Sequence, residues 1–314
     1  MIPDAPGAWD SEFHAPVLAT ELLELFDGAA HILDCTLGGG GHSAALLAMG
    51  ATVTAIDRDS AAVRVARDRL ATHEAAGRFR VILGNFAEVD TLLSDPLLKF
   101  DGIVADLGVS SHQIDDTARG FSFREGSSLD MRMGDDSAGS AADYLNTVTE
   151  QDLSRVFREY GDEPKARRLA REVVRRRSNR LFSTSDDLVG AIRATLGSRS
   201  GSGDFARLFQ AIRIAVNAEI DSLARALPLL RDRLAPGGVL GVISYHSGED
   251  RVVKHAIREW SLDCVCPPRE LRCLCRGRPL GKLVWRKAVV PARAEIGRNP
   301  RARSARFRAW RSEA

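Results

Sequence analysis

Residues 34–43 read Asp34-Cys35-Thr36-Leu37-Gly38-Gly39-Gly40-Gly41-His42-Ser43, and this stretch decides the predicted fold. Residues 30–33 before it, Ala30-His31-Ile32-Leu33, predict a short buried strand, and residues 43–47 predict the start of a helix. Consecutive glycines let the backbone approach a ligand closely, and a helix N-terminus offers unpaired N–H donors. Such a turn is typical of a nucleotide-cofactor loop, although glycine-rich turns also form for packing alone.

A second acid supports the cofactor interpretation. Residues 51–57 predict another strand that ends in Asp57, about 20 residues after the loop, where an acid typically accepts hydrogen bonds from ribose hydroxyls. NAD and S-adenosylmethionine both fit this arrangement. Asp34 ahead of the glycines favours S-adenosylmethionine, because a carboxylate repels a pyrophosphate but attracts an ammonium or a sulfonium. The contiguous glycines also lack the G-x-G-x-x-G spacing of a dinucleotide loop.

Polar groups follow the next two predicted strands as well. Residues 79–83 are followed by Asn85 and Phe86, an amide and an aromatic that suit an adenine. A place for Phe86 in the core is equally consistent with the sequence. Residues 100–105 run into Asp106 and a loop rich in Gly and Ser. Because ligands of open parallel sheets bind outside the carboxyl ends of the strands, these groups are expected to meet at one site.

Strand alternation stops after residue 113, and a run of helices is predicted instead. These helices are expected at residues 141–146, 150–160, 164–177 and 185–196. A Gly/Ser-rich seam at residues 199–203 ends the segment. The predicted fold class is therefore α/β, a Rossmann-like domain with an inserted all-helical domain. The predicted boundaries are 1–113 for its first part, 114–204 for the insertion and 205–314 for its second part.

The last third of the chain is predicted to return to the sheet. One long helix is expected at residues 205–234, followed by a turn at Pro236-Gly237-Gly238 and a fifth strand at 239–245. Residues 283–289 and 304–310 predict an antiparallel hairpin at the sheet edge.

Composition limits the compartment and the partners. The 314 residues carry a net charge of only +2, so no global field dictates a nucleic-acid partner. No apolar run approaches the roughly 20 residues that span a membrane. Residues 1–12 lack a basic-then-apolar signal pattern, and five cysteines in this length make no disulfide scaffold. We therefore expect a cytoplasmic protein without a membrane partner.

Two local clusters need separate interpretations. Arginines are dense at residues 167–180, and again at 298–311, where Phe307 and Trp310 lie among them. Arginines with interleaved aromatics suit phosphates and unstacked bases, but a solvated helix face also explains the first run. The pairs Cys264-x-Cys266 and Cys273-x-Cys275 suggest zinc, yet their spacing is tighter than usual, so a reduced loop or labile disulfide is favoured and no metal is predicted.

Ten short motifs, taken in order, resemble those of the bacterial 16S rRNA cytosine-N4 methyltransferases of the RsmH (MraW) type. They lie at residues 14–18, 34–43, 57–59, 106–111, 119–123, 129–132, 159–163, 209–213, 244–247 and 299–301. So many motifs in one order are specific, whereas a shared Rossmann-like core alone is not.

The resemblance implies an S-adenosylmethionine-dependent methyltransferase domain interrupted by a helical substrate-recognition domain. It implies 16S rRNA as the substrate, within an assembled or assembling 30S subunit. The cofactor-binding positions of the family fall here on Gly40, Gly41, His42, Asp57, Phe86, Asp106 and Gln113. One position departs from the family pattern, because His112 stands where Pro often precedes the glutamine.

The implied chemistry is methylation of an exocyclic amine. This amine is a poor nucleophile because its lone pair is delocalised into the ring, so alignment and a hydrogen-bond acceptor should supply much of the rate. Asp106 is the predicted catalytic residue, acting on the amine or binding only the cofactor, while Tyr245 and His246 lie across the predicted cleft. Methylation at C5 needs a cysteine nucleophile, and Cys35 lies beneath the cofactor loop, on the wrong side for the base.

Two other functions remain consistent with the sequence. One is an amino methyltransferase that acts on another RNA, on DNA or on a protein amide. The other is a cofactor-binding ribosome assembly factor in which the helical domain matters more than methyl transfer. The sequence does not distinguish a monomer from a homodimer.

Overall fold

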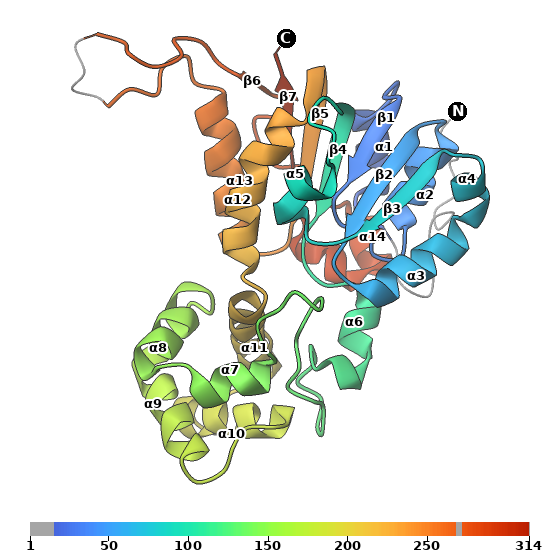
Figure 1. The fold of residues 1–314 in the computed structure, drawn as a ribbon. Coiled ribbons are helices and arrows are strands. Elements are labelled where there is room, and N and C mark those ends of the chain that lie inside the picture. The colour runs from blue at the N-terminus through green and yellow to red at the C-terminus, as the bar shows by residue number, and fades with distance from the viewer. Residues whose placement is uncertain (1–15, 268–271, 314) are drawn as a thin grey trace. The chain divides into compact units, whose positions relative to one another are not determined.

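The computed structural model describes residues 16–267 and 272–313, which form two compact units (Figure 1). The sheet unit runs up to Gly108 and resumes at Ile220, and the helical unit comprises Val109–Glu219. The predicted α/β class with a helical insertion is confirmed. In the part of the chain that is described, no helix is long and apolar enough to cross a bilayer.

Seven strands form one sheet in the order β3-β2-β1-β4-β5-β7-β6. They are β1 (His31–Asp34), β2 (Thr52–Asp57), β3 (Phe79–Leu83), β4 (Phe100–Asp106), β5 (Leu234–Ser244), β6 (Gly281–Leu283) and β7 (Arg306–Ser312). The strands from β1 to β5 pair in parallel, whereas β7 runs antiparallel to both β5 and β6. The strand order reverses between β1 and β4, and ligands of such open sheets bind outside the carboxyl ends of the strands at this point.

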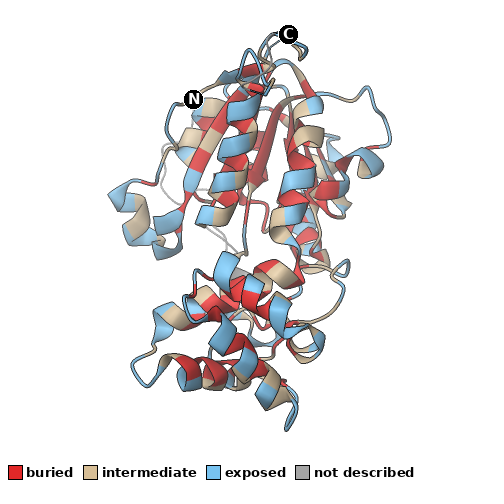
Figure 2. Cartoon of the chain, turned by 90° about the vertical axis from the view of Figure 1, so that its left-hand side faces the viewer, coloured by how far each residue is buried: buried red, intermediate tan, exposed pale blue. Residues whose placement is uncertain are grey.

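Alternate strand residues enter two separate cores, one on each face of the sheet. The central strands are mostly buried, whereas the helices around them carry exposed faces (Figure 2). Ile32 and Val104 pack in one core with α1 (Ala19–Leu25), α2 (Gly41–Ala48) and α3 (Ser60–Arg69). Leu33 and Ile103 pack in the other with α5 (Val89–Leu92), α12 (Glu219–Asp232) and α13 (Ser247–Trp260). The short elements are α4 (Ala71–Ala75), α14 (Arg293–Arg298), η1 (Phe86–Glu88), η2 (Thr117–Arg119) and η3 (Pro300–Ser304).

Two expectations about the far side of the sheet were wrong in detail. β5 already begins at Leu234, and the predicted turn at Pro236-Gly237-Gly238 lies inside it as a bulge, where the register against β4 shifts. Gly237 has a φ of +76°, which only glycine adopts without strain. The hairpin strand predicted at 283–289 is wrong, because β6 ends at Leu283 and shares only that residue with it, while Val289 forms an isolated bridge to Phe307 of β7.

The helical unit buries its own core, separate from the two cores of the sheet unit. Its helices are α6 (Ser111–Asp115), α7 (Ala141–Thr147), α8 (Glu150–Glu159), α9 (Ala166–Arg177), α10 (Ser185–Leu196) and α11 (Ser202–Val216). Apolar faces of α7 to α11 supply most of that core, as their helical periodicity predicts.

The boundaries of the insertion differ from the predicted 114 and 204. The unit extends to Glu219 because α11 packs Leu208, Phe209 and Ile212 into the helical core. The single helix predicted over 205–234 is also wrong, since α11 ends at Val216 and α12 begins at Glu219. Ala218 between them has a φ of +49°, outside the helical region.

The motifs at 119–123 and 129–132 form two loop segments of the helical unit that pack against each other. Gly120 has a φ of +72°, and a Cβ there would lie 2.4 Å from the carbonyl oxygen of Ser128. The Arg119 guanidinium donates to the carbonyl oxygens of Arg132 and Met133. These motifs therefore have a structural role that the sequence alone did not reveal.

The first prediction compares Gly120→Ala with Gly126→Ala. Both glycines have a φ of +72°, but nothing lies within 4 Å of a Cβ at Gly126. Backbone strain alone should cost Gly126→Ala about 1 kcal/mol, whereas the clash should add about 2 kcal/mol or more at Gly120. Urea unfolding measures both, and equal losses of stability would contradict the packing described for Gly120.

Candidate active site at the carboxyl ends of the strands

Three acids stand at the ends of three neighbouring parallel strands. Asp34 ends β1, Asp57 ends β2 and Asp106 ends β4. Strand pairing sets Asp34 beside Ala55 of β2 and Val104 of β4. The predicted convergence of these carboxyl groups at one edge of the sheet therefore occurs.

The glycine loop is fixed by two of these acids. The Gly38 N–H donates to Oδ2 of Asp57 at 2.7 Å, and the Ser43 hydroxyl donates to Oδ2 of Asp34 at 2.7 Å. Gly40, the N-cap of α2, has a φ of +75°, and a Cβ there would press on Leu70 at 3.3 Å. The loop thus depends on side-chain acceptors at both of its ends, with glycine where the backbone turns left-handed.

Burial raises the pKa of two of the acids, Asp34 and Asp57. Desolvation raises the pKa of Asp57 to about 6, although the Asp59 and Gly38 N–H groups oppose the shift. Burial also raises the pKa of Asp34, whose side chain is 1% exposed, despite its hydrogen bond from Ser43. A cationic ligand near these carboxyl groups would favour their charged forms.

Asp106 is held by hydrogen bonds on both its backbone and its side chain. The Tyr245 hydroxyl donates to Oδ1 of Asp106 at 2.9 Å, and the Asp106 N–H donates to Thr36 Oγ1 at 2.6 Å. His42 Nδ1 lies 3.7 Å from Oδ2 of the same carboxyl group. The Asp106 side chain is 10% exposed, so it is oriented by the protein while still reaching the surface.

His42 also links the glycine loop to the segment before α1. Its Nε2 donates to the carbonyl oxygen of Val17 at 2.9 Å, so in the neutral ring Nδ1 carries the lone pair. A Cβ at Gly41 would meet the Pro16 ring at 3.3 Å. These contacts give a structural reason for residues 16–18 of the first motif, while His14 lies outside the described residues.

Tyr245 in turn is fixed by the start of α13. Its N–H donates to Oε2 of Glu249 at 2.8 Å, and Glu249 is 2% exposed. His246 is the N-cap of α13, and its Nδ1 accepts from the Glu249 N–H at 3.3 Å. Burial raises the pKa of Tyr245 well above its usual value, with the Asp106 charge adding to it, so Tyr245 stays a donor.

Some of these residues escaped the sequence analysis. Thr36 sits inside a quoted motif and Glu249 follows one, but neither gave a signal of its partner. Glu295, on α14, accepts the Leu18 N–H at 2.8 Å, and burial raises its pKa. A contact between residues 277 positions apart leaves no local pattern in a sequence.

The remaining predicted site residues lie in two places. Phe86 is half-buried at the start of η1, packed on the core, and Asn85 Oδ1 accepts the Ala87 N–H at 3.0 Å. Gln113 belongs to the helical unit, where its Oε1 accepts the Ser110 N–H at 2.9 Å and caps α6. The side chain of His112 is not among the described ones. The binding roles of these residues remain predictions.

Most arginines at 167–180 already have partners. Arg175 and Arg176 share Glu172, each at 2.7 Å, and Arg177 donates to two backbone carbonyl groups at the end of α7. Arg180 forms an ion pair with Asp187. Arg171 lies 4.0 Å from Glu150, and the other exposed cations of α9 away from Glu172 are Arg167 and Arg168.

In the second basic run the aromatics do not face solvent. Phe307 and Trp310 are each 0% exposed, so their predicted role in stacking on bases is wrong. Phe307 packs on Trp285, and Trp310 packs on Trp260. Strand alternation and the double-sided core of the sheet explain this burial.

A basic groove opens beside the start of α13, with a volume of about 460 Å³. Tyr245 is part of its lining. Its long basic side chains are Arg251, Lys254, Arg303 and Arg306. The acid in the lining, Asp250, pairs with Arg308 at 2.7 Å, whereas within residues 16–267 and 272–313 these four cations form no ion pair. The groove therefore carries uncompensated positive charge next to the hydroxyl that holds Asp106.

The sheet order, the glycine loop and the acids at the strand ends define a Rossmann-like methyltransferase. The chain belongs to the MraW methylase family, whose model matches residues 11–313. The ribosomal RNA small subunit methyltransferase H of Gemmatimonas aurantiaca is 58% identical over 308 residues, covering 98% of each chain. The proteins of the same name from Heliobacterium modesticaldum and Myxococcus xanthus are 41% and 43% identical, covering 94% of this chain and 97% and 96% of theirs.

The predicted cofactor, S-adenosylmethionine, is confirmed by this membership. The residues present fit it, because Asp34, Asp57 and Asp106 line one edge of the sheet and suit a cationic ligand. The glycine loop keeps bulky side chains away from the same edge.

The second prediction concerns Asp57 without the cofactor. Its carboxyl should titrate with a pKa of about 6, against an ordinary value of about 3.9. Because the folded state then binds the proton more tightly than the unfolded state, the unfolding free energy should rise as pH falls from 7 through 6. NMR titration reports the pKa, and Asp57→Asn should lose this part of the pH dependence. A pKa near 4 would contradict the account of desolvation.

Proposed function

We propose that this protein transfers a methyl group from S-adenosylmethionine to the exocyclic N4 of a cytosine in 16S rRNA. The observation that carries the proposal is Asp106, held by Tyr245 and Thr36 at the end of β4 and reaching the surface beside the cofactor loop. The names of the curated relatives support small-subunit rRNA as the substrate class. We place the reaction in the cytoplasm, on assembled or assembling 30S subunits.

The residues divide into binding and chemical roles. Bound S-adenosylmethionine supplies an electrophilic methyl group on a sulfonium. Asp57 accepts hydrogen bonds from ribose hydroxyls, and Phe86 offers a face to the adenine. The remaining binding positions are Gly40, Gly41, His42, Asp106 and Gln113.

Asp106 acts on the target amine. Its carboxylate accepts an N–H of the cytosine amine, which concentrates electron density on nitrogen and aligns the lone pair. The N–C bond forms as the C–S bond breaks, and the surplus amine proton leaves to Asp106 or water. Tyr245 is a positioning residue, because its hydroxyl occupies Oδ1 and leaves other carboxylate lone pairs for the amine.

A covalent enzyme–base intermediate is not part of the proposal. Burial raises the pKa of the Cys35 thiol well above its usual range, and the neighbouring Asp34 charge adds to the shift. A thiol in that state is no nucleophile near neutral pH. Cys35 is also 1% exposed, beneath the loop that binds the cofactor.

The third prediction separates these roles by steady-state methyl transfer. Asp106→Asn keeps the shape but removes the charge, and kcat should fall about 100-fold or more. Tyr245→Phe should lower kcat about tenfold with little change in KM for RNA, since one hydrogen bond to a charged group is lost. Cys35→Ser should retain substantial activity. Abolished transfer in Cys35→Ser with cofactor binding intact would contradict direct transfer.

The rRNA path is proposed to follow the basic groove beside α13, because Tyr245 joins that groove to Asp106. The exposed arginines of α9 give the inserted helical domain a second phosphate-binding face. Transfer of labelled methyl to 30S subunits, compared with transfer to naked 16S rRNA, tests whether the substrate is the assembled particle.

The fourth prediction tests the groove. The triple variant Lys254→Ala, Arg303→Ala, Arg306→Ala should weaken RNA binding and flatten its salt dependence. Each lost phosphate contact should remove about 0.7–0.9 from the log–log slope. Arg80→Ala is the matched control, because Arg80 is exposed on β3 at the other edge of the sheet. An unchanged slope in the triple variant would show that the groove is only solvated surface.

A further inference from the structure

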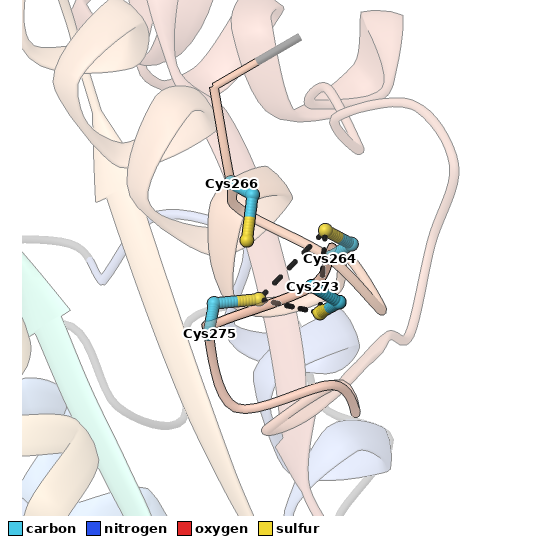
Figure 3. A group of neighbouring side chains, drawn as sticks. All are labelled: Cys264, Cys266, Cys273 and Cys275. Atoms are coloured by element: carbon cyan, nitrogen blue, oxygen red, sulfur yellow. Dashed lines mark hydrogen bonds between the residues drawn. The ribbon is translucent and has the colours of Figure 1, made fainter. Parts of the chain in front are cut away.

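The described cysteines other than Cys35 meet in one loop. Cys264, Cys266, Cys273 and Cys275 lie between α13 and β6, and their Sγ atoms are all within 4.8 Å of one another. Figure 3 shows the four sulfurs pointing toward a common centre from two segments of chain. Neither the methyl-transfer chemistry nor the basic groove uses these side chains.

The sulfur–sulfur distances match a single tetrahedral ion. Cys264 Sγ lies 3.8 Å from both Cys273 Sγ and Cys275 Sγ, and the last two are 3.5 Å apart. Four thiolates at about 2.3 Å from zinc stand about 3.8 Å apart along the edges of a tetrahedron. A disulfide would instead need about 2.05 Å between sulfurs. In a four-iron cluster each cysteine binds a different iron, which separates the sulfurs further.

Backbone donors point at the sulfurs across the loop. The Val265 N–H donates to Cys275 Sγ at 3.3 Å, and the Leu274 N–H donates to Cys266 Sγ at 3.3 Å. Each C-x-C segment thereby donates to a sulfur of the other. This crossed arrangement also explains how two C-x-C pairs can supply the ligands of one metal site, because the ion would lie between the two segments rather than within one.

The described part of the loop has no buried apolar core of its own. Residues 261–267 and 272–280 contain no helix or strand, and Val265 and Leu274 are 37% and 75% exposed. A segment without a buried apolar core needs another cross-link to hold a defined conformation. A structural metal supplies such a cross-link directly as folding free energy.

We propose that Cys264, Cys266, Cys273 and Cys275 bind one structural Zn²⁺. All-thiolate ligation selects a soft or borderline ion, and four protein ligands leave no open position for water. The ion closes the loop and fixes its base to α13, where Arg276 donates to the carbonyl oxygen of Glu259 at 2.6 Å. A bound zinc ion differs from the expectation of no metal, which rested on the C-x-C spacing alone.

The fifth prediction is a metal content. The full chain, purified under reducing conditions without added metal or chelator, should contain one zinc per chain by plasma mass spectrometry. The double variant Cys264→Ser, Cys273→Ser should contain almost none. Cys35→Ser is the matched control and should keep its zinc, since Cys35 is the buried cysteine outside the cluster. Cobalt exchanged into the site should give the absorption of a tetrahedral tetrathiolate centre.

Limited proteolysis gives a second measurement without RNA or cofactor. Chelation should speed cleavage between residues 261 and 280 in the unmodified protein but not in the double variant. Metal-free protein with reactive thiols, disulfides among these cysteines, or iron in place of zinc would each overturn the proposal. None of these results depends on methyl transfer, so failure of the zinc site and failure of the proposed function are distinguishable.

Discussion

The hydrogen bonds from Gly38 to Asp57 and from Ser43 to Asp34 hold the glycine loop at the carboxyl ends of β1 and β2. They connect a backbone that only glycine can follow to acids that the sheet itself positions. Loss of either acceptor would leave a buried donor without a partner, which costs more than the bond contributes. The conformation of the glycine loop therefore depends on the carboxyl groups of Asp34 and Asp57, which the protein keeps partly desolvated.

The same end of the sheet connects Asp106, the proposed catalytic acid, to the groove proposed to bind RNA. Asp106 on β4 and Tyr245 after β5 are joined by one hydrogen bond, and Tyr245 also lines the basic groove. The helical unit has an independent core and internal ion pairs, such as Arg207 with Glu163 at 2.8 Å. The helical insertion can therefore contribute to substrate recognition without changing the strand ends at which the reaction is proposed to occur.

Local patterns predicted the parallel strands and their ends well. β3 matches its predicted range, and the acids of β1, β2 and β4 stand where alternation and the glycine turn indicated. The sequence could not reveal that α11 packs into the helical core, because its apolar face fits either unit. Nor could it show that Trp310 is buried, since the helix that covers β7 there comes from a distant segment. Long-range packing decided each of these cases.

The central claim is direct methylation of a nitrogen. The most direct test is nucleoside mass spectrometry of 16S rRNA after reaction of 30S subunits with the protein and S-adenosylmethionine. The account predicts a methylated cytidine whose methyl is on N4, formed about 100-fold or more slowly when Asp106→Asn replaces the unmodified enzyme. A cytidine methylated on carbon, or no methylated nucleoside with active cofactor binding, would contradict it.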